Sequence, residues 1–303
     1  MSSRPSRVAH VLQLASHRDL EDMRQPSASL TRFFRLLRRL RSQRRTRETA
    51  EAHSDLAQLD LAAAAVSIAA VYRHLDYDSS ALQPDESLTA LYASRGREQW
   101  VYGEVTGIAA LLTLLLSVPS ALGVALHLCD IGSGTGRLVA FAALAGLRST
   151  GVELVPQRHA VAVRAHEQLR QHDAGAASRC AFRCEDALAS TAEPLTGVTH
   201  VLCNNAVWPD ALNAQVARHV MAQARELVAL AMLKQLDTAA LEDAGLVLTR
   251  RSAVGVSWDP MGWPLYIYRP AHAVGNIGAP VQTDDAFFVA EESRMGSAAN
   301  GMC

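Results

Sequence analysis

The chain of 303 residues is poor in aromatic residues, at 5%, and carries almost no net charge, −1 at pH 7. It has only five cysteines, and none of them forms a C-x-x-C pair of the kind that holds zinc. Nor does their spacing indicate a disulfide framework. We therefore expect reduced, structural thiols in an intracellular protein without a metal site. The N-terminus also lacks the apolar region of a signal peptide.

Charged residues are missing from Val105 to Cys129, a stretch long enough to span a membrane. Ser117-Val118-Pro119-Ser120 interrupts it, and proline removes a backbone donor and ends a helix. The second half leads directly into a glycine-rich segment. The sequence therefore predicts a buried helix followed by a buried strand, with no membrane contact.

Positive charge gathers near the N-terminus, in an arginine-rich arm that we define as residues 32–47. Its basic residues are Arg32, Arg35, Arg38, Arg39, Arg41, Arg44, Arg45 and Arg47. Phe33, Leu36 and Leu40 recur among them near helical spacing, which is typical of a basic amphipathic helix. Such a helix can bind nucleosomal DNA or an acidic surface, or it can be a solvated helix or a nuclear localisation signal.

Composition divides the chain into four parts. Residues 1–54 are polar and read as a basic, partly disordered arm. Residues 55–98 hold an Ala-rich helix from Leu56 to Leu75 and a helix that starts near Pro84-Asp85-Glu86, and are predicted as a helical subdomain. Residues 99–270 are predicted as a catalytic core, and residues 271–303, which are rich in Gly and Ala, as a tail.

The most informative stretch is His127-Leu128-Cys129-Asp130-Ile131-Gly132-Ser133-Gly134-Thr135-Gly136, followed by an apolar helix. Glycines permit positive φ and a close approach of the backbone to a ligand, and the helix N-terminus offers free N–H groups. The spacing is D-x-G-x-G-x-G rather than the G-x-G-x-x-G of dinucleotide folds. An acid in this loop suits a ligand with a cationic end, as in S-adenosylmethionine, and the spacing resembles the first motif of class I methyltransferases. The competing interpretation is a glycine-rich turn that packs closely on its helix.

Beyond this motif, strands and helices alternate along the chain. Strands are predicted over 148–153, 179–186, 198–205, 245–249, 253–258 and 263–268, and helices over 156–171 and 209–235. Alternation of this kind predicts an α/β fold with a doubly wound, mostly parallel sheet. Ligands of such sheets bind beyond the carboxyl ends of the strands. We therefore expect four residues that end successive strands, Asp130, Glu153, Asp186 and Asn204, to share one crevice.

The chemistry of S-adenosylmethionine matches these residues. A carboxylate at Asp130 can meet its amino-acid end, and Glu153 can accept both ribose hydroxyls. Asp186 can accept from the adenine amine, and the N–H of Ala187 can bond the ring. Taken alone, each acid fits a solvated turn residue or a helix cap equally well.

Several motifs in order resemble the DOT-type (disruptor of telomeric silencing, non-SET) histone H3 lysine methyltransferases. They are Val101-Tyr102-Gly103-Glu104, Asp130-Ile131-Gly132-Ser133-Gly134, Thr150-Gly151-Val152-Glu153, Asn204-Asn205 and Val256-Ser257-Trp258. The resemblance covers about residues 100–268 and is nearest to the compact trypanosomatid branch. It implies a class I methyltransferase fold, S-adenosylmethionine as cofactor without a metal, histone H3 in nucleosomes as partner, and a nuclear location.

The resemblance also implies roles for the matching residues. Tyr102 and Glu104 belong to a loop that closes over the cofactor, and Asn204 faces the methyl-transfer centre. Trp258 helps to form a lysine channel, with Tyr266 or Tyr268 as its second aromatic wall. The cofactor-binding set is Tyr102, Glu104, Asp130, Gly132, Gly134, Gly136, Arg137, Glu153, Asp186, Ala187 and Asn204.

This chain departs from the family pattern at several positions. Ala187 replaces the usual Phe after the adenine-binding acid, Arg137 replaces a Gln, and Val105 replaces a Thr. Residues 231–244 read as an insertion. Two other functions remain open: a class I methyltransferase for another protein, RNA or a small-molecule amine, and a binding module without catalysis.

Overall fold

A computed structural model describes residues 61–73, 75, 86–94, 103–105, 126–189, 195–257, 263–274 and 282–283. The arginine-rich arm, Tyr102, Trp258 and the apolar stretch 106–125 lie outside the described residues, so the predictions made for them stay predictions. Within the described part, no helix is long and apolar enough to cross a bilayer.

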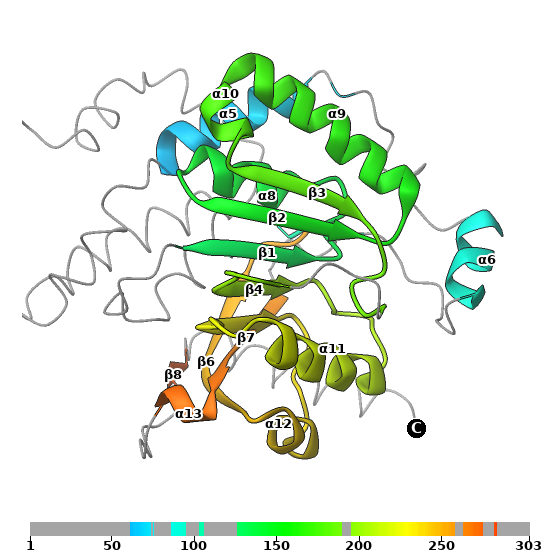
Figure 1. The fold of residues 1–303 in the computed structure, drawn as a ribbon, viewed down its shortest axis with the longest axis vertical. Coiled ribbons are helices and arrows are strands. Elements are labelled where there is room, and N and C mark those ends of the chain that lie inside the picture. The colour runs from blue at the N-terminus through cyan, green and yellow to red at the C-terminus, as the bar shows by residue number, and fades with distance from the viewer. Residues whose placement is uncertain are drawn as a thin grey trace, which may run out of the picture.

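An eight-stranded sheet forms the centre of the described structure, in the order β3-β2-β1-β4-β5-β7-β6-β8 (Figure 1). Strands β1 to β5 pair in parallel, and β7 runs antiparallel to both β5 and β6. The strand order reverses between β1 and β4, which is where doubly wound sheets open a ligand crevice. The strands are β1 His127–Ile131, β2 Arg148–Glu153, β3 Cys180–Cys184, β4 His200–Cys203, β5 Ala229–Met232, β6 Leu246–Val254, β7 Trp263–Pro270 and β8 Gln282–Thr283.

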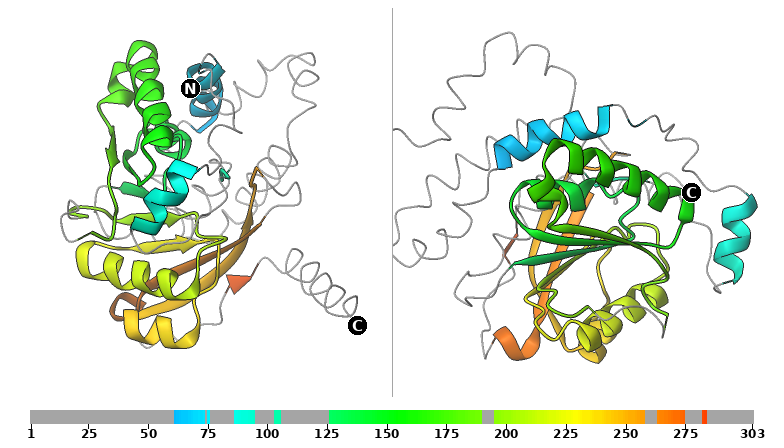
Figure 2. Two further views of the ribbon diagram at one scale, coloured as in Figure 1. Left: turned by 90° about the vertical axis from the view of Figure 1, so that its right-hand side faces the viewer. Right: turned by 45° about the horizontal axis from the view of Figure 1, so that its top comes forward.

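Helices cover both faces of this sheet, as Figures 1 and 2 show. On one face lie α5 Leu61–Arg73, α8 Arg137–Leu144, α9 Pro156–His172 and α10 Ala174–Ala177, and on the other lie α11 Asp210–Gln223 and α12 Thr238–Ala244. Two apolar clusters fill the two sides. The predicted stripe of α9, Val161, Ala165 and Leu169, is buried as expected from its four-residue spacing. Helix α6 Glu86–Ser94 and helix α13 Ala271–Val274 complete the described elements.

Strand β5 corrects the predicted helix over 209–235. Helix α11 ends at Gln223, and Ala229–Met232 is a fully buried strand between β4 and β7. An unbroken apolar run is the pattern of a strand buried on both faces, but its Ala and Leu residues have high helix propensity. Tertiary burial overrides that propensity. The supposed insertion over 231–244 is therefore the end of β5 followed by α12.

The C-terminal part of the sheet differs from the prediction in two ways. The strands expected over 245–249 and 253–258 are largely one strand, β6, with an irregular register between Leu248 and Arg250. Beyond Pro270, where a tail was predicted, β8 pairs in parallel with β6. The hairpin partner expected at residues 263–268 is confirmed as β7.

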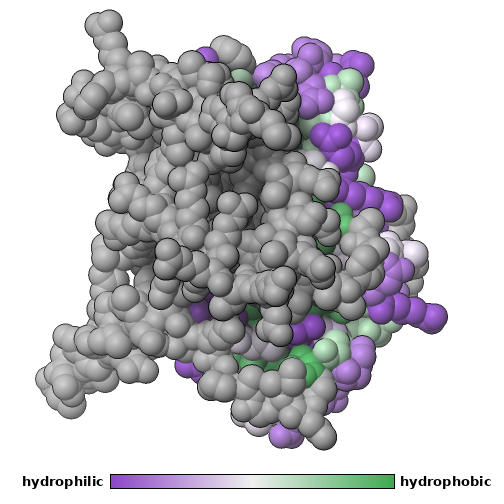
Figure 3. Space-filling model, turned by 90° about the vertical axis from the view of Figure 1, so that its left-hand side faces the viewer, coloured by the Kyte–Doolittle hydropathy of each residue, from purple (hydrophilic) through white to green (hydrophobic). Residues whose placement is uncertain are grey.

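The surface seen from one side in Figure 3 is mostly hydrophilic over the described residues, and apolar side chains emerge only in small areas. Among the residues that the structure describes, the exposed large apolar side chains are Val66, Val163 and Val207, which come from three separate elements or loops. Isolated exposed apolar residues are normal on soluble domains and mark no site by themselves.

Candidate functional site

The glycine-rich loop leaves β1 and turns into α8 at the point where the strand order reverses. The N–H groups of Gly132 and Ser133 both donate to the Val152 carbonyl, at 2.8 and 3.1 Å, which ties the loop to β2. Gly132 and Gly134 have φ of 78° and 56°, a region that L side chains rarely adopt. The predicted turn is thus present, with its backbone held against the neighbouring strand.

Gly136 has a packing role that its place in the motif does not reveal. A Cβ at this position would lie 2.4 Å from Phe182 Cε1 and 2.9 Å from Ala162 Cβ. The side of Gly136 where a Cβ would point is therefore filled by β3 and α9. For this glycine the structure favours the close-packing interpretation of the motif.

Asp130 is buried beside the loop and has an oxygen without a protein partner. The side chain is 5% exposed, Oδ1 makes no hydrogen bond, and the residue lines a small cavity together with Gly132, Gly134 and Asn204. Burial, and then the nearby carboxylates of Glu153 and Glu104, raise the pKa of Asp130 to about 7. A buried carboxyl group of this kind is satisfied by a cationic hydrogen-bond donor.

Ser133 also lines this cavity, and its Oγ lies 2.7 Å from where a Cβ on Gly151 of β2 would be. Its Oγ is buried and makes no hydrogen bond in the structure, and the residue lines the cavity with Asp130. A hydroxyl can both donate and accept, so it suits the carboxylate of an amino-acid ligand. The sequence analysis missed Ser133 because it occupies an unspecified position of the motif.

Glu104 is attached to the loop from the other side of the cavity. Its carboxylate accepts the hydroxyl of Thr135, and its backbone N–H donates to Ser257 Oγ at 2.9 Å. Val105 forms a bridge with Val256, next to the end of β6. The segment Gly103–Val105 thus lies beside the Val256-Ser257 pair, although about 150 residues separate the two in the sequence.

Helix α5 contacts the glycine-rich loop through a hydrogen bond. Its buried Tyr72 donates its hydroxyl to the Thr135 carbonyl at 2.9 Å. Arg137, predicted as a cofactor ligand, lines the cavity and has its guanidinium 5.4 Å from the centre of the Tyr72 ring. The N-terminal helix therefore contacts the loop directly.

Glu153 ends β2 as predicted, and each of its carboxylate oxygens accepts a hydrogen bond from a backbone N–H group. Oε2 accepts the Gly134 N–H at 2.7 Å, and Oε1 accepts the Val155 N–H at 2.8 Å. Burial raises the pKa of this carboxyl group, while these two hydrogen bonds and the charge of Arg158 oppose the increase. Each carboxylate oxygen has a second acceptor position, so contact with ribose hydroxyls stays a prediction.

Asp186 and Ala187 follow β3, at the same edge of the sheet. Asp186 is buried, and its Oδ1 accepts the Leu188 N–H at 3.0 Å. Ala187 packs against the apolar cluster on the α11 face. Their contact with adenine stays a prediction.

The two asparagines after β4 have different surroundings. Asn204 lines the cavity of Asp130 and donates from Nδ2 to the Gly103 carbonyl at 2.8 Å. Asn205 is fully buried, and its Oδ1 accepts the N–H groups of Leu233 and Lys234 at 2.6 and 3.1 Å. Its Nδ2 donates to Asn213 Oδ1 at 3.0 Å. Asn205 therefore joins the loops after β4 and β5, a role the sequence did not predict because it depends on β5.

We expect Asn205→Ala to lower the free energy of unfolding by about 2–3 kcal/mol, because it leaves the buried N–H of Leu233 and the partly buried N–H of Lys234 without their acceptor. Urea denaturation measures the loss. Asn204→Ala is the matched control, because Asn204 is only partly buried and makes a single bond to Gly103. An equal loss in both variants would contradict the special role of Asn205.

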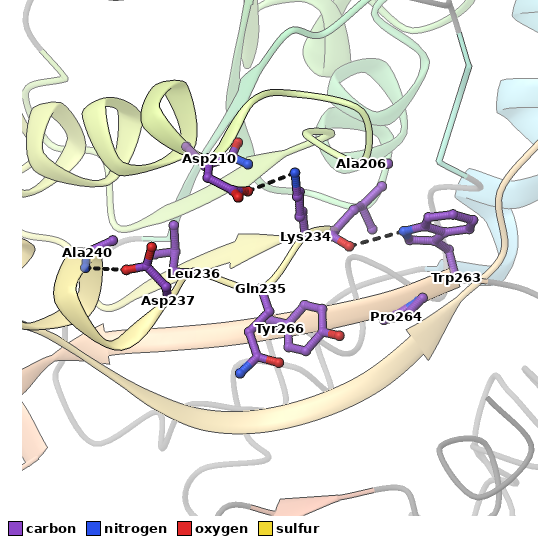
Figure 4. Close-up of a pocket in the computed structure, with 12 residues that line it drawn as sticks. Ala206, Asp210, Lys234, Gln235, Leu236, Asp237, Ala240, Trp263, Pro264 and Tyr266 are labelled. Atoms are coloured by element: carbon purple, nitrogen blue, oxygen red, sulfur yellow. Dashed lines mark hydrogen bonds and ion pairs between the residues drawn. The ribbon is translucent and has the colours of Figure 1, made fainter. Parts of the chain in front are cut away.

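The two tyrosines proposed for the channel have different environments. Tyr266 is partly buried and lines a second, larger cavity beside the loops after β4 and β5 (Figure 4). Tyr268 is fully buried, and its hydroxyl oxygen accepts the Leu236 N–H at 2.9 Å. Tyr268 is therefore a core residue and not a channel wall, which corrects that part of the prediction. Trp263, which was not predicted, lines the larger cavity with Tyr266.

Metal-binding residues do not gather in the described part of the chain: no three His, Cys, Asp or Glu residues there could jointly hold an ion. The four described cysteines Cys129, Cys180, Cys184 and Cys203 are free. Burial raises the pKa of Cys129 to about 12, so this thiol is unreactive.

Comparisons with known proteins give matches to solved structures only. No protein-family model and no curated protein sequence matches the chain. An RNA methyltransferase from Salinibacter ruber with S-adenosyl-L-homocysteine is 20% identical, with 52% of this chain and 86% of that chain covered and a TM-score of 0.36. Magnesium protoporphyrin IX methyltransferase from Synechocystis with bound S-adenosylmethionine is 14% identical, with 66% and 89% covered and a TM-score of 0.43. Mitomycin 7-O-methyltransferase is 19% identical, with 69% and 68% covered and a TM-score of 0.40.

The fold class does not depend on these comparisons. Parallel pairing of β1 to β5, reversal of the strand order between β1 and β4, and helices on both faces are the features predicted from the sequence. The predicted doubly wound, mostly parallel α/β sheet is confirmed, and its assignment to class I methyltransferases stays a prediction.

Proposed function

We propose that the chain is a class I methyltransferase that uses S-adenosylmethionine, and that its acceptor is a lysine of histone H3 in nucleosomes. The observation that carries the first part is Asp130, a buried carboxyl group whose Oδ1 has no protein partner, placed at a glycine-rich loop at the switch point of the sheet. An amino-acid ammonium group supplies the missing donor, and the Ser133 hydroxyl can bond the accompanying carboxylate.

Each residue of the proposed site has a separate task, and Glu153, Asp186 and Ala187 lie outside the lining of this cavity, at or just after the ends of β2 and β3. Asp130 and Ser133 bind the amino-acid end, Glu153 the ribose, and Asp186 and Ala187 the adenine. Asn204 holds the Gly103 carbonyl, and Glu104 bonds Thr135, so the segment Gly103–Val105 is kept against the glycine loop. When bound, S-adenosylmethionine supplies a methyl group on a cationic sulfonium, and the chain itself aligns the acceptor with it.

A lysine acceptor must reach the site as a neutral amine, although its ordinary pKa is about 10.4. Burial lowers the pKa of an ammonium group, so an apolar, aromatic entrance favours the neutral form. Tyr266 and Trp263 supply an aromatic wall of this kind on one side of the larger cavity, beside the loop that follows β4. Alignment and desolvation then account for the rate, with the proton lost to water.

The histone part of the proposal is supported by the convergence of the DOT-type motifs. Gly103 and Glu104 contact both Asn204 and Ser257, so motifs from three distant parts of the chain meet at the loop. The arginine-rich arm supplies the charge for contact with nucleosomal DNA or an acidic surface, and it also suits a nuclear protein.

The test is incubation of the full chain with methyl-labelled cofactor and, separately, nucleosomes, free histones, RNA and small amines. Mass spectrometry then reports the modified site and the number of methyl groups. We expect methylation of a lysine in histone H3 and little of RNA or amines. Methylation of RNA or a small amine alone would overturn the histone assignment, and absence of cofactor binding would overturn the whole proposal.

Cofactor affinity should increase between pH 6 and pH 7.5. Because the pKa of Asp130 is about 7 in the free protein, the carboxyl group is protonated at pH 6 and must lose its proton to pair with an ammonium group. Isothermal titration of S-adenosyl-L-homocysteine should give about a fivefold lower Kd at pH 7.5, with proton release on binding. An affinity independent of pH would mean that Asp130 does not pair with the ligand.

A further inference from the structure

The second cavity lies at the loops after β4 and β5 and shares no lining residue with the cavity of Asp130. It encloses about 520 Å³, within the range of cavities that bind small ligands. Trp263, Pro264 and Tyr266 of β7 form one wall, and Asp210 and Lys234 form the opposite one (Figure 4). A lysine side chain alone has only five heavy atoms beyond Cα, so the cavity has room for a second group.

Hydrogen bonds hold the walls of this cavity in place. Trp263 donates its indole N–H to the Leu233 carbonyl at 3.1 Å. The Lys234 ammonium bonds the Trp208 carbonyl at 3.0 Å and lies 2.8 Å from Asp210 Oδ1. Because Asn205 also ties Leu233 and Lys234 to the end of β4, the cavity is formed before any ligand arrives.

The two ends of the cavity differ in chemistry. At one end are Ala206, which follows Asn204 and Asn205 in the chain, and Trp263, while Asp237 and Ala240 lie at the other end (Figure 4). The charge of Lys234 is matched by Asp210. Among the charged residues lining the cavity, Asp237 has no ion-pair partner. It is exposed to solvent and caps α12, so this end of the cavity carries a solvent-facing carboxylate.

The chemical class of the ligand follows from this arrangement. A basic side chain finds an aromatic wall for cation–π contact and a carboxylate for a charge-assisted hydrogen bond. A phosphate group would meet the negative end. We infer that the cavity binds a lysine or arginine side chain of the substrate polypeptide close to the methylated residue, with Asp237 as the residue that selects for its charge. This inference rests on the proposed function. It adds that the methylated lysine has a lysine or arginine close to it in the substrate polypeptide.

Asp237→Asn tests the inference without removing a structural bond. Asp237 caps α12 by accepting the Ala240 N–H at 2.7 Å, and asparagine is an equally good helix cap. The matched control is Asp243→Asn, on the same helix, which removes only an exposed ion pair with Arg218. Thermal unfolding of both variants shows that the fold is intact.

The first measurement uses N-acetylarginine methylamide, titrated by NMR into the full chain saturated with S-adenosyl-L-homocysteine. N-acetylcitrulline methylamide is the neutral analogue. We expect the arginine probe to bind about tenfold more tightly than the citrulline probe, and Asp237→Asn to remove most of that preference while Asp243→Asn keeps it. Equal binding of the two probes, or a preference that survives Asp237→Asn, would overturn the inference.

The second measurement is methyl transfer to histone H3. Asp237→Asn should raise KM for the polypeptide about fivefold to tenfold with kcat within about twofold, because it weakens binding and not alignment. Transfer with an unchanged KM would overturn the inference and leave the proposed function intact. Selective binding of the arginine probe by a chain that methylates no polypeptide would support the cation site and overturn the proposed acceptor.

Discussion

Asp130→Asn should raise the Kd for S-adenosyl-L-homocysteine by about 30-fold to 1000-fold. The loss corresponds to about 2–4 kcal/mol, the usual cost of removing one partner of a buried charge pair. Asparagine keeps the shape of the side chain and removes its charge, so the effect reports the charge at Oδ1. Isothermal titration at pH 7.5 measures it, with Asp173→Asn, a capping residue of α10, as control.

The same variant should not destabilise the fold, and this separates a binding role from a structural one. The pKa of Asp130 is raised in the folded chain, so its contribution to stability is fully present below about pH 4 and is lost as the pH rises through about 7. At pH 8 the buried Asp130 carboxylate is charged and lowers the stability of the fold. Asp130→Asn removes this charge and should therefore raise the free energy of unfolding at pH 8 by about 1–3 kcal/mol. A variant that binds normally, or that loses stability and binding together, would contradict the proposed role of Asp130.

Gly136→Ala should lower the free energy of unfolding by about 2–5 kcal/mol. The new Cβ would meet Phe182 Cε1 at 2.4 Å and Ala162 Cβ at 2.9 Å, and overpacking of a core costs about 1–3 kcal/mol. The φ of 79° adds about 1–2 kcal/mol for any L side chain. Urea denaturation followed by circular dichroism measures the sum.

Gly245→Ala separates the two contributions. Gly245 has a similar φ of 66°, but nothing lies within 4 Å of the added Cβ. We therefore expect this control to lose only about 1–2 kcal/mol, which is the backbone strain alone. Equal losses at the two glycines would show that Phe182 and Ala162 give way, and that close packing at Gly136 is not what requires glycine.

The candidate site combines residues that could be predicted with residues that could not. Asp130, Glu153 and Asp186 end parallel strands, and the carboxyl ends of such strands meet at one edge of a sheet. The position of all three acids at this edge therefore follows from the order of elements alone. Ser133 lines a cavity that also includes Gly103 and Asn204, and Asn205 bonds the loop after β5, so the importance of both depends on residues distant in the sequence.

The sequence by itself determined the order of strands and helices from β1 to α11, the glycine turn and the edge at which the acids lie, because these depend on periodicity and on backbone geometry within a few residues. Only the tertiary structure decided that Ala229–Met232 is a strand, that Tyr268 belongs to the core, and that Trp263 and Asp237 share a cavity. The physical reason is that burial between two other strands outweighs the helix propensity of alanine and leucine, and that packing across the sheet, not spacing along the chain, assigns each side chain to a core or a cavity.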